Sequence, residues 1–315
     1  MIDTAATTDT TPIIDPSAYA SATDAIRAEA VRLLTEGAVA AVVGFIPGRR
    51  KGSAIPGIVS SPEKARELLF SPACVNNLAL YLTKAKKEVR GRGRLAIVAK
   101  GCDMRALAGL MGESQLKRED LVIIGVACAG VHGAGASPSD QLSAATIARK
   151  CRECSVHEPA GADVVCGSLP QLPELTPLEA EELARLEAMT PAERWAYWKE
   201  QFSRCIRCLA CRQVCPFCYC EQCLCDKNRP QAVETSPRPA ANMGWHIVRA
   251  MHLAGRCAGC AECERACPMD IPLNLLNRKM AKELKELFGH EAGLTPKEKG
   301  PLAEYKETDD QSFIK

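Results

Sequence analysis

The sequence has few aromatic side chains, few histidines and no long apolar run. Phe, Trp and Tyr make up 4% of the 315 residues, and there are five histidines. No segment approaches the roughly 20 apolar residues that span a bilayer. The first 20 residues have neither the basic start nor the apolar stretch of an export signal. We therefore expect no membrane insertion and a cytoplasmic location.

The charges are almost balanced, with 40 basic and 38 acidic residues and a net charge of +2. Such a balance gives no reason to expect nucleic acid as a partner. The few histidines are scattered, and no acid-base or nucleophilic constellation stands out. We therefore predict no catalytic residues of the chain's own.

Cysteine, in contrast, is abundant, with 18 residues. In a chain without an export signal, this indicates reduced, metal-binding thiols and an anaerobic or strongly reducing cell. The run Cys-x₂-Cys-x₂-Cys-x₃-Cys-Pro occurs twice, at residues 205–216 and 257–268. With this spacing, the first three thiolates bind one 4Fe-4S cluster and the fourth binds the other cluster. Zinc fits less well, because zinc sites usually place two cysteine pairs a dozen or more residues apart. The predicted ligands are Cys205, Cys208, Cys211 and Cys267 for one cluster, and Cys257, Cys260, Cys263 and Cys215 for the other.

Two more cysteines follow predicted strands in the first half of the chain. Residues 94–99 and 121–126 are typical of buried strands, and a predicted helix at 104–111 joins them. A short crossover of this kind indicates parallel strands, so Cys102 and Cys128 should emerge at one edge of the sheet. A Cys-x₂-Cys pair follows a predicted helix at 141–148. We predict a third 4Fe-4S cluster on Cys102, Cys128, Cys151 and Cys154; the alternative is a set of buried free thiols and one isolated pair.

The pattern as a whole predicts an α+β chain. A small parallel α/β domain is followed by a mainly helical domain that resembles a two-cluster ferredoxin. The expected divisions are a flexible arm at 1–22, the α/β domain at 23–170, the helical domain at 171–295 and a tail at 296–315. Further helices are expected from Asp24, over 73–85, after capping boxes at Thr176 and Thr190, and over 242–253 and 273–287.

The 41 residues between the two cysteine runs open with four more cysteines. A fourth cluster could use Cys218, Cys220 and Cys223 with either Cys225 or Cys74, and zinc is an equal competitor because the spacing matches neither standard cluster run. Charged and polar neighbours tune cluster potentials, so we also note His246 and His252 ahead of the second run. Five arginines close to the runs have the same potential role: Arg204, Arg207, Arg212, Arg256 and Arg265.

Two segments resemble known proteins. The stretch Lys100-Gly101-Cys102-Asp103, followed by the strand ending at Cys128 and the pair at Cys151, is similar to the beta subunits of deazaflavin-reducing hydrogenases and formate dehydrogenases. The stretch from Cys205 to Cys223 resembles iron-sulphur subunits of heterodisulfide-reductase-like and formate dehydrogenase modules. The resemblance implies an electron-transfer subunit whose partners are a catalytic oxidoreductase subunit and another redox subunit.

The beta subunits bind a flavin in a longer domain after the Cys-x₂-Cys pair. Only about fifty residues separate Cys154 from Cys205 here. An electron relay through three or four clusters is therefore the leading hypothesis. A flavoenzyme that uses FAD to pass hydride-derived electrons into the clusters is the alternative.

Overall fold

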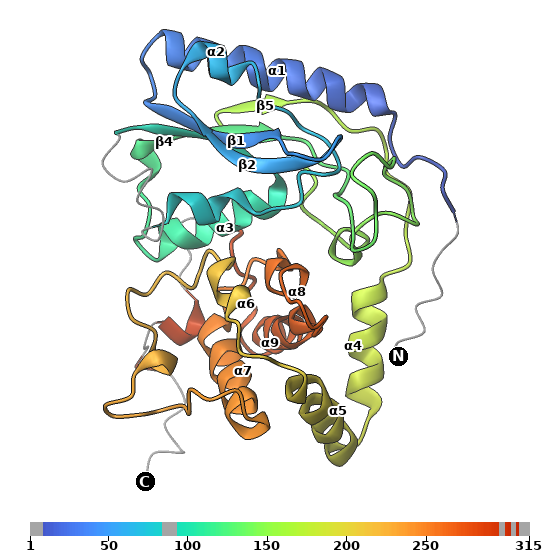
Figure 1. The fold of residues 1–315 in the computed structure, drawn as a ribbon, viewed down its shortest axis with the longest axis vertical. Helices are drawn as coiled ribbons and strands as arrows, with labels where there is room; N and C mark the ends of the chain where they lie inside the picture. The colour runs from blue at the N-terminus through green and yellow to red at the C-terminus, as the bar shows by residue number, and fades with distance from the viewer. Residues whose placement is uncertain (1–8, 84–92, 296–299, 304–306, 309–315) are drawn as a thin grey trace.

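The computed structural model describes residues 9–83, 93–295, 300–303 and 307–308. One five-stranded sheet occupies the first half of the chain, and the second half is helical (Figure 1). None of the helices in the described ranges is long and apolar enough to span a membrane. The elements in chain order are α1 (Pro16–Thr35), β1 (Ala41–Pro47), β2 (Ala54–Val59), α2 (Pro62–Ala65), η1 (Leu78–Leu82), β3 (Leu95–Ala99), α3 (Gly101–Gly112), η2 (Arg118–Asp120), β4 (Leu121–Val126), η3 (Arg149–Cys151), β5 (Val164–Cys166), α4 (Leu178–Ala188), α5 (Pro191–Ser203), α6 (Ala210–Gln213), η4 (Leu224–Asp226), α7 (Pro239–Leu253), α8 (Glu262–Arg265), α9 (Leu273–Phe288) and η5 (Pro301–Ala303).

The sheet has the strand order β2-β1-β3-β4-β5. Only the β1–β2 pair is antiparallel; the other three pairs are parallel. The predicted parallel pair is confirmed, with Ala99 of β3 opposite Gly125 of β4, so both strands end at the same edge. The sequence analysis did not predict β2, which contains Pro56 and lies at the sheet edge, where a missing backbone N–H is tolerated.

Helices cover both faces of the sheet. The α1 and α2 helices lie on one face, and α3 lies on the other, between the sheet and the helical half (Figure 1). The hydrophobic core of the sheet continues into that half, because Phe217 and Leu253 belong to the same buried cluster. A Cβ atom on Gly109 of α3 would lie 2.8 Å from the Phe217 ring. The absence of a side chain at Gly109 therefore permits the close contact between the two halves.

A polar contact accompanies this packing. Glu113, at the end of α3, accepts hydrogen bonds from the Tyr219 hydroxyl and from Arg256 Nη2, both at 2.7 Å. Within the helical half, α5 packs on α7, α4 on α9, and α6 on α8. The predicted helices at 242–253 and 273–287 are confirmed within three residues, as α7 and α9.

The predicted arm at 1–22 is wrong in part. The helix starts at Pro16 and not at Asp24, because Asp15 caps it by accepting a hydrogen bond from the Ser17 amide at 2.8 Å. The pair Asp15-Pro16 could have predicted this start, because Asp is a common N-cap residue and Pro is common at the first helical position. Residues 1–8, and most of the predicted tail, lie outside the described residues.

Two predicted helices are not formed. Residues 73–77 are turn and coil, and only the short helix η1 follows; residues 84 and 85 lie outside the described ranges. At 141–148 the Thr146 hydroxyl donates to the Gln141 carbonyl and accepts from the Ser143 amide, which replaces helical bonding. Near residues 73–77, side chains likewise bond the backbone, since the Ser71 hydroxyl accepts from the Ala73 amide and Asp103 accepts from the Leu78 amide.

The capping box predicted at Thr176 is also wrong, whereas the box at Thr190 is confirmed. The helix α4 begins after Pro177 without a side-chain cap, and Glu153 instead accepts hydrogen bonds from its first amides. The carboxylate of Glu179 is drawn away to Arg278 and Asn274.

Candidate metal centres

Cys102 and Cys128 lie at the carboxyl edge of the parallel strands. The helix α3 begins at Gly101, directly after β3, so Cys102 lies in its first turn. Cys128 follows β4 by two residues. The amides at a helix N-terminus favour a negative charge. This edge therefore suits an anionic, thiolate-bound group.

All four cysteines of the predicted third cluster line one cavity of about 60 Å³. They come from three separate places: the start of α3, the loop after β4, and the segment around η3. Burial raises the pKa of the Cys102 thiol to about 11, although Lys150 and Lys100 oppose that rise. The structure thus brings together Cys102, Cys128, Cys151 and Cys154.

Cations outnumber carboxylates around this cavity. Its wall includes one carboxylate, from Glu153, and four cationic side chains, from Lys100, Arg105, Lys150 and Arg278. Burial opposes the charge of Lys150, but the thiolates of Cys102 and Cys151 outweigh that effect and raise the pKa of Lys150. The donor set and the surplus of positive charge fit an anionic iron-sulphur cluster.

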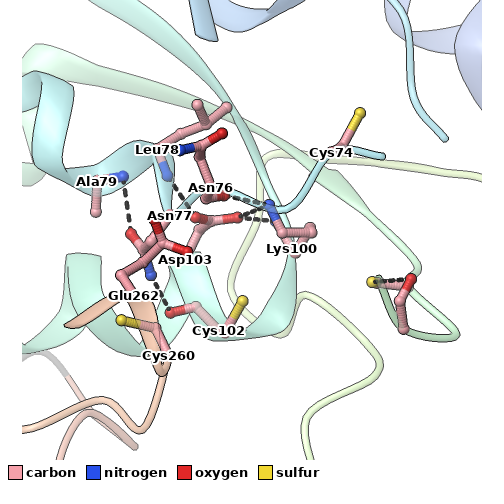
Figure 2. Close-up of polar contacts among 12 residues, drawn as sticks. Cys74, Asn76, Asn77, Leu78, Ala79, Lys100, Cys102, Asp103, Cys260 and Glu262 are labelled. Atoms are coloured by element: carbon pink, nitrogen blue, oxygen red, sulfur yellow. Dashed lines mark hydrogen bonds and ion pairs between the residues drawn. The ribbon is translucent and has the colours of Figure 1, made fainter. Parts of the chain in front are cut away.

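A buried ion pair supports the Cys102 turn from behind (Figure 2). Asp103 Oδ2 accepts from Lys100 Nζ at 3.0 Å and from the Lys100 amide at 2.9 Å. Asp103 Oδ1 accepts from the Leu78 amide at 2.7 Å. The side-chain amide of Asn77 donates to the Cys102 carbonyl at 3.0 Å. The sequence analysis missed this network, although an acidic residue in the first turn of a helix was a usable signal.

The two ferredoxin-type runs fold alike. In each run the third cysteine lies in a one-turn helix, α6 or α8. The residue before that helix is left-handed in both runs, with φ of 61° at Leu209 and 52° at Ala261. The residue two positions earlier is also left-handed, at Arg207 and Gly259. These backbone turns direct successive thiols towards a common centre.

The first run forms a small cavity of about 20 Å³ together with the last cysteine of the second run. Its walls include the side chains of Trp245, His246 and Ile271. Burial raises the pKa of the Cys211 thiol, and the thiols of Cys205 and Cys267 add to that rise. The structure thus places the four cysteines of one predicted set around one space: Cys205, Cys208, Cys211 and Cys267.

The other predicted set is also brought together, deeper in the protein. Cys260 and Cys263 are buried, with 9% and 7% exposure, as is Cys215, with 9%. Burial raises the pKa of Cys263 to about 12, and Cys257 and Cys215 act on it in the same direction. Cys215 of the first run therefore lies among the thiols of the second run, as the crossed ligand pattern requires.

The cysteines assigned to a fourth cluster are not brought to one place. Cys74 is buried in the sheet core, where its thiol contacts Ser71 and the Leu69 carbonyl. Cys218 lies beside Cys215, and Cys220 is exposed. Cys223 and Cys225 pack in the helical core. Among the described residues, no three His, Cys, Asp or Glu side chains lie close enough to hold a single metal ion, and this is as true of the three cysteine sets above as of these cysteines.

The expected arginines make most of their hydrogen bonds to other groups, although Arg207 lies beside the Cys205 thiol and Arg265 beside that of Cys260. Three of the five expected arginines pair with carboxylates: Arg212 with Asp226, Arg256 with Glu113, and Arg265 with Glu262. Arg204 donates to the Met269 carbonyl and Arg207 to the Ala241 carbonyl. The sequence analysis missed Arg249, which is 5% exposed and lies among Cys211, Cys215 and Cys263.

The histidines also differ from the expectation. His246 lines the cavity of the first run, not of the second run, and it is 3% exposed. Burial lowers the pKa of His246 to about 3, and nearby Arg249 and Arg207 add to the fall. His252 is exposed on α7.

Comparisons with known proteins find relatives of this chain. A 98-residue segment is 35% identical to the F420-dependent formate dehydrogenase subunit beta of Methanocaldococcus jannaschii. This match covers 31% of this chain and 25% of that subunit. The F420-dependent formate dehydrogenase 1 subunit beta of Methanococcus maripaludis is 22% identical over 83% of this chain and 88% of its own length. The chain is similar to formate dehydrogenase beta subunits. The resemblance to formate dehydrogenase beta subunits drawn from the residues is thereby confirmed.

The strongest of these matches spans about a quarter of the relative's length. No family model matches the chain. Among solved structures, a chain of the F420-reducing NiFe hydrogenase complex from Methanosarcina barkeri aligns with a TM-score of 0.31 and 14% identity, over 39% of this chain and 44% of that one. That likeness is too slight to indicate a common fold.

Proposed function

We propose that the chain is an electron-transfer subunit of a larger anaerobic oxidoreductase complex and holds three 4Fe-4S clusters. Each cluster would supply one-electron redox chemistry. The ligands would be the three cysteine sets described above. The beta-subunit relatives support the class of complex, and a catalytic subunit and another redox subunit are the expected partners.

The observation that carries this proposal is the serial arrangement of the three thiol groups. Lys150 lines the cavity of the Cys102 set, and its Nζ donates to the carbonyl of Cys260 in the second run at 2.6 Å. Arg249 joins the two runs, since it donates to the Cys211 carbonyl at 3.1 Å and lies beside Cys215 and Cys263.

The series ends at the protein surface. Of the twelve ligands, only Cys208 of the first run is exposed. The second run therefore stands between the Cys102 cavity and a thiol group that a partner can approach. A chain that only bound metal for stability would have no need of this order.

The test is to quantify iron, sulphide, zinc and flavin together on chain purified without oxygen. We expect about twelve irons per chain and matching sulphide, four for each cluster, and no flavin. Iron near eight with zinc present would contradict the Cys102 cluster, and a stoichiometric flavin would favour the flavoenzyme. About sixteen irons would restore the fourth cluster despite the separation of its cysteines.

Gly101→Ala is expected to remove the Cys102 cluster. A Cβ atom at this position would lie 1.6 Å from the Val156 carbonyl oxygen, so the segment that carries Cys154 must move. We expect a loss of about four irons per chain and of about 1 to 3 kcal/mol in the free energy of unfolding. Iron analysis and denaturant unfolding measure both effects.

Gly244→Ala is the matched control. Its added Cβ would be 3.8 Å from the nearest atom, on Val233, which is ordinary contact. We expect this variant to keep all its iron. A Gly101→Ala protein with full iron content would show that the Cys154 segment can shift without disturbing the ligands.

A further inference from the structure

The helix α7 carries two buried polar side chains that face the thiol groups of both runs. His246 and Arg249 are three residues apart, so they lie on the same side of the helix. They are 3% and 5% exposed. Each has a ring or guanidinium nitrogen without a hydrogen-bond partner among the described residues, His246 Nε2 and Arg249 Nε. Buried polar atoms rarely remain unpartnered, and these two call for an acceptor that the polypeptide does not supply.

The position of His246 is fixed by stacking. Its ring lies on Phe202 of α5, with 4.4 Å between centroids and 13° between planes. The same ring lines the cavity of the first run, beside Cys205, Cys211 and Cys267. Because one face of the ring is stacked on Phe202, the ring can contact a group in this cavity through its edge, which carries Nε2.

The position of Arg249 is fixed by its hydrogen bond to the Cys211 carbonyl. The titratable groups that act on Arg249 are thiols, foremost those of Cys263 and Cys215. Among the described residues, no carboxylate forms an ion pair with Arg249. A guanidinium that is buried without a counter-charge destabilises the fold. An anionic cluster on the second run would remove that destabilisation.

Resting on the proposed function, we propose that α7 sets the reduction potentials of the two clusters in the helical half. His246 Nε2–H donates to sulphur of the first-run cluster, and Arg249 Nε–H donates to sulphur of the second-run cluster. Hydrogen bonds and positive charge stabilise the reduced, more negative cluster, so each raises the potential of its own cluster. His246 and Arg249 act here as hydrogen-bond donors to the clusters and not as ligands of the iron.

The experiment is a redox titration followed by electron paramagnetic resonance on the full chain, with iron measured on each sample. The two signals are assigned by their loss in Cys267→Ala and Cys215→Ala. We expect His246→Phe to lower the potential of the first-run cluster alone. Arg249→Met should lower that of the second-run cluster most. His246→Gln, which keeps an N–H at the same reach, should restore most of the potential.

Arg238→Met is the matched control, because Arg238 caps the same helix but its side chain is 78% exposed. It should leave both potentials unchanged. If Arg249→Met loses iron, Arg249→Lys decides, since it keeps the charge and removes Nε–H; we expect a smaller fall at the second-run cluster. Unchanged potentials in iron-replete His246→Phe and Arg249→Lys would overturn the proposal. Wild-type chain without iron would instead overturn the proposed function.

Discussion

Asp103→Ala is expected to lower the free energy of unfolding by about 3 to 5 kcal/mol, because it leaves the buried Lys100 ammonium without its carboxylate partner. Both side chains are almost fully enclosed, at 0% and 2% exposure. The substitution also removes the acceptors of the Leu78 and Lys100 amides. Denaturant unfolding under anaerobic conditions measures the loss.

The matched control is Asp120→Ala. Asp120 is exposed in the turn before β4, and no described ion pair involves it. We expect its removal to change the stability by less than about 0.5 kcal/mol. The double variant Asp103→Leu with Lys100→Met should recover much of the loss, because it removes both charges together. A cost for Asp103→Ala no greater than for Asp120→Ala would mean that Lys100 finds another partner.

Replacing the last cysteine of either run by alanine is the second change with a large expected effect. Cys267→Ala should remove the first-run cluster, although Cys267 belongs to the second run in sequence, and iron should fall from about twelve to about eight per chain. Cys215→Ala should remove the second-run cluster instead. The geometry behind this is the cavity that Cys267 shares with Cys205, Cys208 and Cys211.

Cys220→Ala is the matched control, because Cys220 is exposed and lies in none of the three sets. We expect it to keep all its iron. The remaining signal after each ligand substitution identifies the cluster that was lost. Loss of the second-run signal in Cys267→Ala would reverse the crossed assignment.

The sequence predicted best where chemistry dictates spacing. The two runs place their thiols by a fixed pattern of two and three intervening residues, and the strand ends place Cys102 and Cys128 at one edge because parallel strands end together. Cys151 and Cys154 were placed by their pairing alone. The helix predicted at 141–148, ahead of them, is absent, so their place beside Cys102 and Cys128 does not depend on that helix.

The parts that could not be predicted depend on contacts between distant segments. Asn77 caps η1 by accepting a hydrogen bond from the Ala79 amide, and its side-chain amide also donates to the Cys102 carbonyl, 25 positions away. Arg249 has no neighbour in sequence that marks it, and only its contacts with both runs in the folded protein reveal its place among the thiols. Local propensity contains no information about such partners.

The close packing of Phe217 against Gly109 limits how the helical half could be used as a separate module. Because the sheet and the helical half share one core, the two-run half could not be cut out and grafted as an independent module without exposing Phe217 and Leu253 to water. The gaps across which electrons would tunnel are therefore held by side-chain packing and not by a flexible tether. The distances between clusters should therefore stay constant when partner proteins bind and dissociate.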